Sequence, residues 1–376
     1  MNQRYFRRAK KNAMISLKSS PYLIVGCAIA TIILLLSLRN HGSASSTPSI
    51  WGLSSQPVRS SNGNFRSASA RKTIDTTSEI GRASNATLGF HKILVLGLPE
   101  RSDKRDAFVL SASLTGFEVE FFDAVKGDQI LDKTRPPGLN LKDGALGTWR
   151  SHLNAIRSIL ENNFASVFIM EDDADWDIRL LSQLAEFAKG VRFLSGVKPS
   201  QPQHSPYGDD WDILWPGHCG DVLPKNDDRR YTIANDETVA PKAHQPWLKG
   251  LKDLPEKTRI VHKAGAPMCT FGYAVSYRGA QKIMMALAIK AGANLAIDNG
   301  MAYLCRDGFL DLKCYSVEPQ LFQHHRPAGS VNKDSDINVA NSDAVRQKGV
   351  TDFIVLSARL NMEQMIMGSD QYVKQW

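Results

Sequence analysis

Three consecutive carboxylates, Glu171, Asp172 and Asp173, follow the apolar run 165–170 (ASVFIM). The run is typical of a buried strand, and the ligands of open α/β sheets bind at the carboxyl ends of strands. Three neighbouring acids repel one another unless a cation or a hydrogen-bond donor neutralises them. Their oxygen atoms favour Mg²⁺ or Mn²⁺, and such an ion can bridge a diphosphate and neutralise charge on a phosphate leaving group. The same acids could instead form a solvated turn that caps the next helix, so the residues alone leave both interpretations open.

The segments around this triplet alternate between strand and helix patterns. We expect strands at 91–98, 117–125, 165–173, 211–217 and 268–275, and helices at 104–114, 147–162, 180–194 and 279–291. This alternation predicts an α/β sheet with helices on both faces. Residues 196–262 are rich in Pro, His, Asp and Lys, which predicts long loops. Residues 341–376 are expected to be a C-terminal appendage or cover behind a domain at 90–340.

The N-terminal part predicts a membrane anchor. The segment 21–39 contains an uncharged run at 22–38 (YLIVGCAIATIILLLSL), which is at the short end of what crosses a bilayer as a helix. Basic residues crowd the segment 1–20 before it, so the positive-inside rule places that tail in the cytosol and the rest in the lumen. A short span suits the thinner membranes of the early secretory path, which favours a type II signal anchor in the Golgi membrane. A cleaved signal peptide and a mitochondrial presequence fit the unbroken leucine-rich run less well.

Residues 40–89 are rich in Ser, Thr, Gly and Asn and show no hydrophobic periodicity, which is typical of a disordered stem. The stem contains an N-glycosylation sequon, Asn85-Ala86-Thr87, which has meaning if this side of the membrane is lumenal. The sequence therefore predicts a tail, an anchor, a stem and then the folded domain.

Charge and cysteine content limit the possible partners. The formal net charge is +8, yet no Asp or Glu precedes Asp75, and eleven of the 46 basic residues do. From Asp75 onward 35 basic residues face 38 acidic ones, so the folded part is slightly acidic and nucleic acid is not expected as a partner. Four cysteines follow the anchor, and in an oxidising lumen they could form up to two disulfides in any of three pairings. There is no CxxC pair, which argues against a structural zinc site.

Four blocks of the sequence resemble glycosyltransferase family 25, the group that includes lipopolysaccharide galactosyltransferases and collagen galactosyltransferases. ILVLGLPERSDKRDAF resembles the family's opening strand and its NL-x-x-R-x-x-R motif, with Gly97 in place of Asn, and FFDAVKG resembles F-x-D-A-V-D-G, with Lys126 departing. LGTWRSHLNAIRSILENNFASVFIMEDDADW resembles G-x-x-x-S-H-x-x-x-W followed by V-x-E-D-D. The segments CTFGYAVSYRGAQKIM, AIDNGMAYLCRD and LFQHHRPAGSVNKDSDI resemble the family's later motifs. The blocks span Ile93 to Ile337, and membrane-anchored fungal members are the most similar in appearance.

The resemblance implies a GT-A-like, single Rossmann-type domain with a mixed, mostly parallel sheet. It implies a hexosyltransferase that uses a UDP-sugar, with galactose or glucose as the sugar, and Mn²⁺ or Mg²⁺. The acceptor would be a hydroxyl group of a glycan or glycoprotein, and the transfer would invert the anomeric carbon. The alternatives are an inactive, lectin-like glycan-binding protein and a metal-dependent phosphodiesterase or glycosidase. Kinase, dinucleotide-binding and α/β-hydrolase motifs are absent from the sequence.

Site residues follow from the same comparison. The metal ligands would be the acid triplet together with His324, and the general base would be Asp298, with Asp172 or Asp173 as the alternative. The residues expected at the nucleotide sugar or beside it are Arg101, Arg105, Asp123, His152 and His218. Each has an ordinary structural alternative: a helix or turn cap for the acids, a solvated helix start for the arginines, and a structural role for the histidines.

Overall fold

The computed structural model describes residues 75–245, 253–290, 294–337 and 342–376. The expected cytosolic tail, the anchor at 21–39 and most of the stem lie outside these residues. Within the described part, no helix is both long and apolar enough to span a bilayer. The strands are β1 (Lys92–Gly97), β2 (Glu120–Asp123), β3 (Ser166–Glu171), β4 (Ala174–Trp176), β5 (Ile213–Gly217), β6 (Arg230–Ile233), β7 (Arg259–Lys263), β8 (Gly272–Ser276), β9 (Cys314–Glu318), β10 (Phe322–His324), β11 (Gly329–Ser330) and β12 (Val345–Arg346). The α-helices are α2 (Ser102–Thr115), α3 (Asp143–Glu161), α4 (Leu180–Leu194), α5 (Tyr277–Ile283), α6 (Ile297–Asp307) and α7 (Met362–Ile366).

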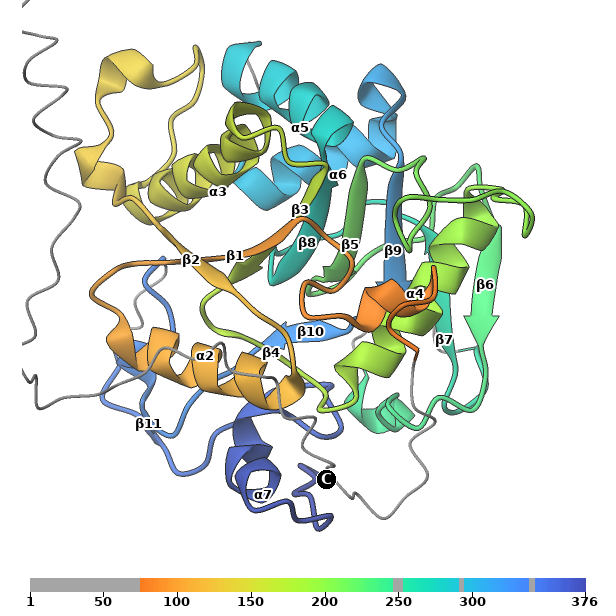
Figure 1. Ribbon diagram of the computed structural model, residues 1–376. Coiled ribbons are helices and arrows are strands. Elements are labelled where there is room, and N and C mark those ends of the chain that lie inside the picture. Colours follow the sequence, from red (N-terminus) through yellow and green to blue (C-terminus); the bar gives the residue numbers. More distant parts are fainter. Residues whose placement is uncertain (1–74, 246–252, 291–293, 338–341) are drawn as a thin grey trace, which may run out of the picture. The chain divides into compact units, whose positions relative to one another are not determined.

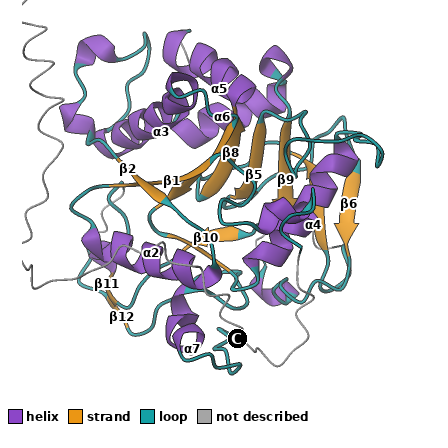
Figure 2. Ribbon diagram, viewed as in Figure 1, coloured by secondary structure: helices purple, strands orange, loops and turns teal. Residues whose placement is uncertain are grey.

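A mixed sheet runs through the centre of the domain in the order β2-β1-β3-β8-β5-β9-β7-β6, and β10 joins it by pairing with β4 and β5 (Figures 1 and 2). β1 pairs in parallel with β2 and β3, and β5 pairs in parallel with β9 and β10. The pairs β3·β8, β5·β8, β7·β9, β6·β7 and β4·β10 are antiparallel. The predicted α/β class with a mixed, Rossmann-like sheet is confirmed.

Helices cover both faces of the sheet, as predicted (Figure 1). Successive residues of a strand point to opposite faces, and β1 shows this clearly. Leu94 and Leu96 pack into the core formed with α3, α5 and α6. Ile93 and Val95 pack into the core formed with α2 and α4. The strand is therefore apolar on both sides, which is why its sequence reads as a continuous hydrophobic run.

Seven of the described strands were not predicted. β7 and β9 are five-residue strands that are largely buried, and the other five are short or solvated on one side. β4 and β10 have three residues each, and β6 alternates exposed and half-buried positions. Long loops occupy most of the described residues within 196–262, as expected, but β6 lies within this range and β7 begins at its end. They form an antiparallel pair at the edge of the sheet.

Residues 75–89, which the composition assigns to a disordered stem, are folded onto the domain. Ala83 and Leu88 are fully buried, and the carbonyl of Leu88 accepts a hydrogen bond of 2.9 Å from the Tyr207 hydroxyl. The Ser84 hydroxyl donates to the carbonyl of Leu181 at the start of α4. Residues 75–89 therefore belong to the folded part, held by these apolar side chains and hydrogen bonds and by the pair of Glu79 with Arg192. Asn85 lies in this segment, half-buried.

The C-terminal segment is more than an appendage. Asp175, which is fully buried, accepts hydrogen bonds from the hydroxyls of Thr351 and Ser357 and from the backbone N–H of Arg359. The Arg359 guanidinium donates to the carbonyl of Asp172 at 2.9 Å. Residues 351–359 thus hold the turn that follows the acid triplet, which explains why the local sequence around that turn is so acidic.

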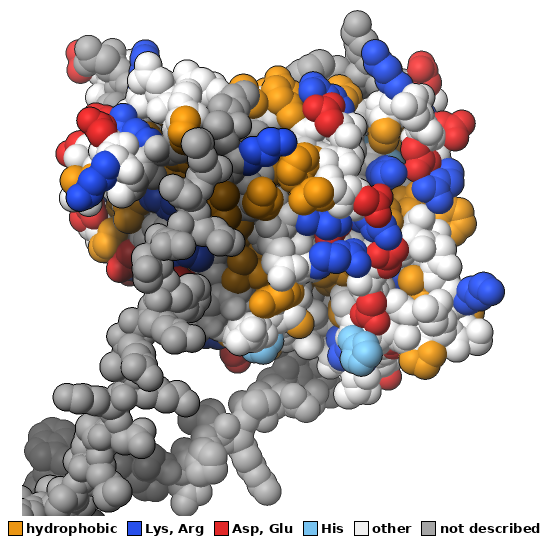
Figure 3. Space-filling view, turned by 90° about the horizontal axis from the view of Figure 1, so that it is seen from above, with side chains coloured by type: hydrophobic (Ala, Val, Ile, Leu, Met, Phe, Trp, Pro, Cys, Tyr) orange, Lys and Arg blue, Asp and Glu red, His pale blue; other side chains and the backbone are white. Residues whose placement is uncertain are grey.

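Two disulfides form, Cys219–Cys269 and Cys305–Cys314. They use the four cysteines that follow the expected anchor and select one of the three pairings left open by the sequence. Figure 3 shows one face of the molecule, on which Lys and Arg side chains are interspersed with Asp and Glu.

Candidate active site

A cavity of about 690 Å³ opens at the carboxyl ends of β1 and β3. The register of the sheet pairs Leu96 with Glu171 and Gly97 with Asp123, so the ends of β1, β2 and β3 meet at one edge. The cavity is lined there by the acid triplet, by the backbone that follows β2 and by the first turns of α3 and α6. Of the predicted site residues, it brings together Glu171, Asp172, Asp173, His152, Asp298 and His324.

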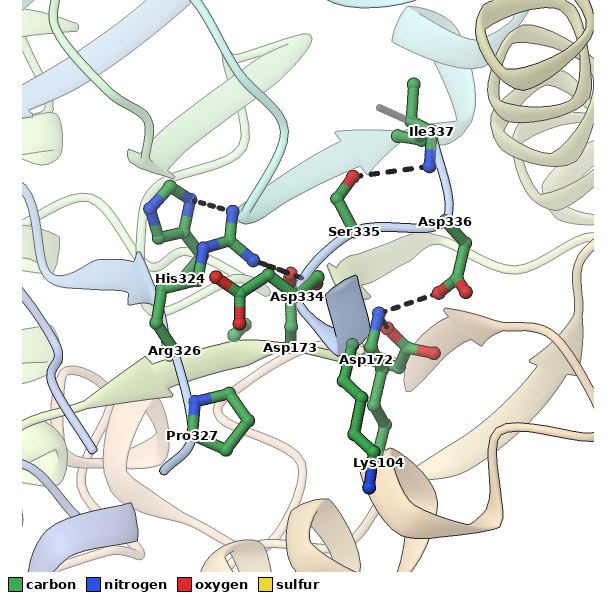
Figure 4. Close-up of polar contacts among 12 residues, drawn as sticks. Lys104, Asp172, Asp173, His324, Arg326, Pro327, Asp334, Ser335, Asp336 and Ile337 are labelled. Atoms are coloured by element: carbon green, nitrogen blue, oxygen red, sulfur yellow. Dashed lines mark hydrogen bonds and ion pairs between the residues drawn. The ribbon is translucent and has the colours of Figure 1, made fainter. Parts of the chain in front are cut away.

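Asp172 is 6% exposed and faces the ammonium group of Lys104 from α2 (Figure 4). The Lys104 Nζ lies 3.2 Å from Asp172 Oδ1 and 2.9 Å from Asp336 Oδ2. Burial raises the pKa of Asp172 to about 6, although the charge of Lys104 acts in the opposite direction. Burial also opposes the charge of Lys104, but the carboxylates of Asp173 and Asp172 outweigh it and raise the lysine's pKa. The ammonium group is therefore a fixed cation between two carboxylates.

Gly97 makes this position of Asp172 possible. A Cβ atom on residue 97 would lie 2.8 Å from the Cβ of Asp172 and closer still to its carboxylate. Any side chain at this position would have to displace Asp172. The departure from the family's Asn at Gly97 is therefore coupled to where the Asp172 carboxylate lies.

Asp173 faces the opposite wall, where Arg326 follows β10 (Figure 4). The guanidinium NH1 of Arg326 donates to Asp173 Oδ2 at 2.9 Å, and its NH2 donates to His324 Nδ1 at 3.1 Å. The other carboxylate oxygen of Asp173, Oδ1, is buried and has no hydrogen-bond partner. It is a candidate position for a ligand that the protein itself does not supply.

Glu171 is the most strongly perturbed acid of the triplet. Burial, together with the charges of Asp173, Asp172 and Asp298, raises the pKa of Glu171 to about 8. Its Oε1 accepts a hydrogen bond from the Thr270 hydroxyl and lies 3.7 Å from His152 Nε2. A carboxyl group with a pKa near neutral is able to carry a proton at physiological pH.

His152 lies on the buried face of α3 and lines the same cavity. Its Nδ1 lies 2.9 Å from the Tyr273 hydroxyl, and burial lowers its pKa to about 3. The imidazole is therefore neutral, and its hydrogen bond to Tyr273 fixes the ring beside Glu171.

Asp298 enters the cavity from the first turn of α6. Its Oδ1 accepts the backbone N–H of Asn299 at 2.8 Å, and its Oδ2 accepts the backbone N–H of Cys269 at 3.1 Å. Cys269 adopts a left-handed backbone conformation (φ 65°) that side chains rarely take, and it is tied to Cys219 by a disulfide. Both the helix start and the disulfide loop therefore position this carboxylate.

Arg101, Arg105 and Asp123 are near this edge, but they are not among the described residues that line the cavity. Arg101 pairs with Asp103 and Asp336, and Arg105 pairs with Asp123 and donates to the carbonyl of Gly97 at 3.0 Å. Both arginines lie at the start of α2, as the structural alternative expected, but their guanidinium groups are ion-paired there and not solvated. Their contacts hold α2 and the Asp336 segment against the sheet.

His218 is placed elsewhere and is not among the described residues that line the cavity. It is fully buried at the end of β5, its Nε2 lies 3.1 Å from the carbonyl oxygen of Val317, and its Nδ1 lies 3.6 Å from Glu318 Oε1. The strand expected before His218 is present. The side chain points into the sheet's own polar interior and not into the cavity.

Sequence reasoning overlooked Lys104 and Arg326. Their carboxylate partners are separated from them by long stretches of chain, so no local spacing reveals the pairs. A signal for Lys104 was present, because it occupies the second Arg position of the NL-x-x-R-x-x-R motif. Asp336 also lines the cavity, and it binds Arg101 and Lys104.

The four expected metal ligands do not form a ready cluster. Among the described residues, no group of three or more His, Cys, Asp or Glu side chains is arranged to hold a metal ion. The reason is that Asp172 is paired with Lys104, Glu171 with Thr270, and His324 with Arg326. The unpartnered Oδ1 of Asp173 nevertheless fits a divalent ion, because Mg²⁺ at phosphate sites takes one or two carboxylates and completes its coordination with phosphate oxygens and water.

Comparisons with known proteins agree with the sequence motifs. The chain is 22% identical over 308 residues to procollagen galactosyltransferase 1 of Danio rerio, covering 75% of this chain and 44% of that protein. It is 21% identical over 211 residues to a glycosyltransferase 25 family member of Aedes aegypti, covering 52% and 28% of the two chains. Procollagen galactosyltransferase 2 of Mus musculus is 21% identical over 258 residues, covering 62% and 35%. The chain thus spans less than half the length of these relatives, and no protein-family model matches it. The relatives confirm the predicted resemblance to glycosyltransferase family 25.

Proposed function

Taking the chain as a distant relative of glycosyltransferase family 25, we propose that it transfers a hexose from a UDP-sugar to a hydroxyl group of a glycan or glycoprotein. One observation carries the proposal: carboxylates from β3 and from α6, far apart in the sequence, line a single cavity at the carboxyl ends of β1 and β3. Ligands of α/β sheets bind at this edge. The mixed sheet with helices on both faces supports a GT-A-like domain, and the names of the relatives favour galactose over glucose.

Asp298 is the residue we assign as general base. Its Oδ1 accepts hydrogen bonds from the backbone N–H and the side-chain amide of Asn299, whereas Oδ2 accepts the backbone N–H of Cys269 and keeps a further lone pair for an acceptor hydroxyl. As the acceptor oxygen forms its bond to the anomeric carbon, Asp298 takes the hydroxyl proton. The bond between that carbon and the diphosphate oxygen breaks, and UDP leaves. Attack from the face opposite the diphosphate inverts the anomeric carbon.

Asp173 would hold a divalent ion, Mn²⁺ or Mg²⁺, through its unpartnered Oδ1. When bound, the ion would neutralise negative charge on the leaving diphosphate. Lys104 and Arg326 neutralise the remaining oxygens of Asp172 and Asp173, so the diphosphate meets fewer uncompensated carboxylates.

The two disulfides in the described domain suit an oxidising compartment. They support the proposed location in the Golgi lumen, behind a membrane anchor at residues 21–39. The acceptor would then be a glycan or protein in transit through the secretory path.

The proposal is tested by incubating the purified full-length chain with UDP-galactose, UDP-glucose and other UDP-sugars in Mn²⁺, with and without EDTA. We expect release of UDP that stops in EDTA and in Asp173→Asn, and that persists in Asp370→Asn, a matched change at an exposed position. A phosphodiesterase would instead release UMP and a hexose phosphate. A lectin-like protein would bind glycans and release no nucleotide with any donor, and either result would refute the assignment.

A further inference from the structure

His324 occupies a fixed position in the cavity wall. It ends β10, where its backbone is paired with Ala174 of β4, and its ring meets Phe271 edge to face with centroids 4.8 Å apart. The side chain lines the cavity, and its Nδ1 lies 3.1 Å from NH2 of Arg326 (Figure 4). Within the part of the chain that the structure describes, its Nε2 has no hydrogen-bond partner. One ring nitrogen is therefore engaged by the protein and the other is available to a ligand.

The partner of Nδ1 decides the chemistry of Nε2. A guanidinium group can donate hydrogen bonds and cannot accept them, and it does not lose its proton in proteins. Nδ1 must therefore be the acceptor and carry no proton. A neutral imidazole has one N–H, so the proton lies on Nε2. A protonated ring, or a ring turned over, would place a donor or a C–H group against the guanidinium.

Arg326 is itself held from several sides. NH1 donates to Asp173 Oδ2 at 2.9 Å and to the carbonyl of Asp334 at 3.0 Å. The carboxylate of Asp334 is bound by both terminal nitrogens of Arg346, at 3.0 and 2.7 Å. The guanidinium is thus unable to turn away from His324 without breaking a network that includes Asp173, and the protonation pattern of the ring is built into the fold.

We infer that His324 is a hydrogen-bond donor to an anionic oxygen of the ligand, and not a metal ligand. A metal ion needs a lone pair, and Nε2–H has none to offer. The anion is the diphosphate of the nucleotide sugar, so the inference rests on the proposed function. The inference adds one contact to that function, a hydrogen bond from Nε2–H to the leaving diphosphate. As the bond to the anomeric carbon breaks, negative charge grows on the oxygens that Nε2–H is able to reach.

The test compares three substitutions that separate donors from metal ligands. Gln keeps an N–H donor near the position of Nε2, Glu offers a carboxylate that binds metal but repels phosphate, and Ala removes both. Binding of UDP to the purified full-length chain is measured by calorimetry, first in EDTA and then in Mn²⁺. We expect His324→Ala to weaken UDP binding about tenfold or more in EDTA. His324→Gln should stay within about threefold of wild type, and His324→Glu should bind more weakly than His324→Ala.

The opposite order of UDP affinities overturns the inference. If His324→Glu binds nearly as wild type does, His324→Gln binds no better than His324→Ala, and no variant differs from wild type in EDTA, then His324 is a metal ligand. His204→Ala, a change at a fully exposed histidine, should leave binding unaltered. NMR of the chain with ¹⁵N-labelled histidine gives an independent readout, in which we expect His324 to carry its proton on Nε2, and a proton on Nδ1 refutes the argument.

The two proposals fail in different ways. If UDP does not bind, but the variants bind inorganic pyrophosphate in the order of affinity expected above, the contact between His324 and an anion is supported. The proposal that the donor is a nucleotide sugar is then refuted. If UDP is released from a UDP-sugar and all three variants bind UDP as wild type does, the sugar transfer stands and the role of His324 falls.

Discussion

Replacing Lys104 with Met removes the cation between Asp172 and Asp336 while keeping most of the apolar stem. The side chains of Lys104 and Asp172 are 12% and 9% exposed, so this pair is largely withdrawn from water. Removing one partner of a buried pair costs about 3–5 kcal/mol when the remaining charge cannot be neutralised. Asp172 can be neutralised, and this limits the cost.

The magnitude follows from the pKa of Asp172, which is raised to about 6 in the presence of Lys104. Without the lysine the folded-state pKa rises further, and at pH 7 the carboxylate takes up a proton. The pKa of Asp172 lies one unit below pH 7, so protonating this carboxylate in the folded protein costs about 1.4 kcal/mol at that pH. Losing the charge of Lys104 can therefore lower the free energy of unfolding through Asp172 by no more than this amount. Asp336 keeps its pair with Arg101 and is partly exposed, so its loss adds less than about 1 kcal/mol. We expect a total of about 1.5–2.5 kcal/mol at pH 7.

The sign of the pH dependence is a further check. Raising a folded-state pKa removes stability as pH rises and has no effect where the group is protonated in both proteins. The loss in Lys104→Met should therefore be small at pH 5 and largest at pH 8. Urea denaturation at pH 5, 7 and 8 measures it. In an Asp172→Asn background the same substitution should cost less than about 1 kcal/mol at every pH.

Lys92→Met provides the matched control, because Lys92 pairs with Glu120 at an exposed edge, with side chains 37% and 57% exposed. Its cost should stay below about 1 kcal/mol at all three pH values. A loss in Lys104→Met that does not change with pH, or that persists in full in Asp172→Asn, would refute the account of the Lys104–Asp172 pair.

Three further outcomes are expected. Asp298→Asn should lower kcat for transfer by about 10²- to 10⁴-fold with the donor KM within about threefold, and an unchanged kcat in a steady-state assay would exclude it as the base. Gly97→Ala should cost about 1–3 kcal/mol in urea denaturation because its Cβ would collide with Asp172, and an unchanged midpoint would contradict that packing. Burial lowers the pKa of His218 to about 4, with the charge of Asp221 partly opposing it, so the unfolded chain binds a proton that the folded chain does not. Stability should therefore fall as pH drops below about 6.5, by up to about 1.4 kcal/mol per unit, and His218→Gln should lack this part of the slope.

The fold was predictable where the chain buries apolar side chains on both faces of a strand. β1, β3 and β5 are such strands, and each was expected close to its observed position. β4 and β10 are too short to show a period, and they exist because they pair with each other. A pairing between residues separated by most of the domain leaves no trace in either segment alone.

The acid triplet of the site was predictable because its three carboxylates are adjacent in the sequence. The expectation that Asp298 joins them came from the family resemblance, and the cavity contains all four carboxylates. Arg326 could not be assigned, because a basic side chain on a loop is ordinarily solvated, and Lys104 was overlooked although it occupies a basic position of the family motif. Their roles depend on the folding of α2 and β10 against the end of β3.

His218 shows the converse. A histidine after an apolar strand was expected at the nucleotide sugar or beside it, and the same pattern is equally typical of a buried side chain within the sheet. The residue type, histidine, indicated a role in the substrate site, whereas the direction of the side chain depends on the pairing of β5 with β9 and β10.

The bond between Cys219 and Cys269 has a consequence for anyone who prepares this protein. The Cys269 N–H that holds Asp298 belongs to a loop fastened by that bond, so a batch made in a reducing host would lose one of the two constraints on this carboxylate, while the Asn299 N–H would remain. If Asp298 is the base proposed above, such material would turn over poorly and would imitate an inactive lectin. Thiol titration of each batch should therefore come before any conclusion that the protein lacks activity.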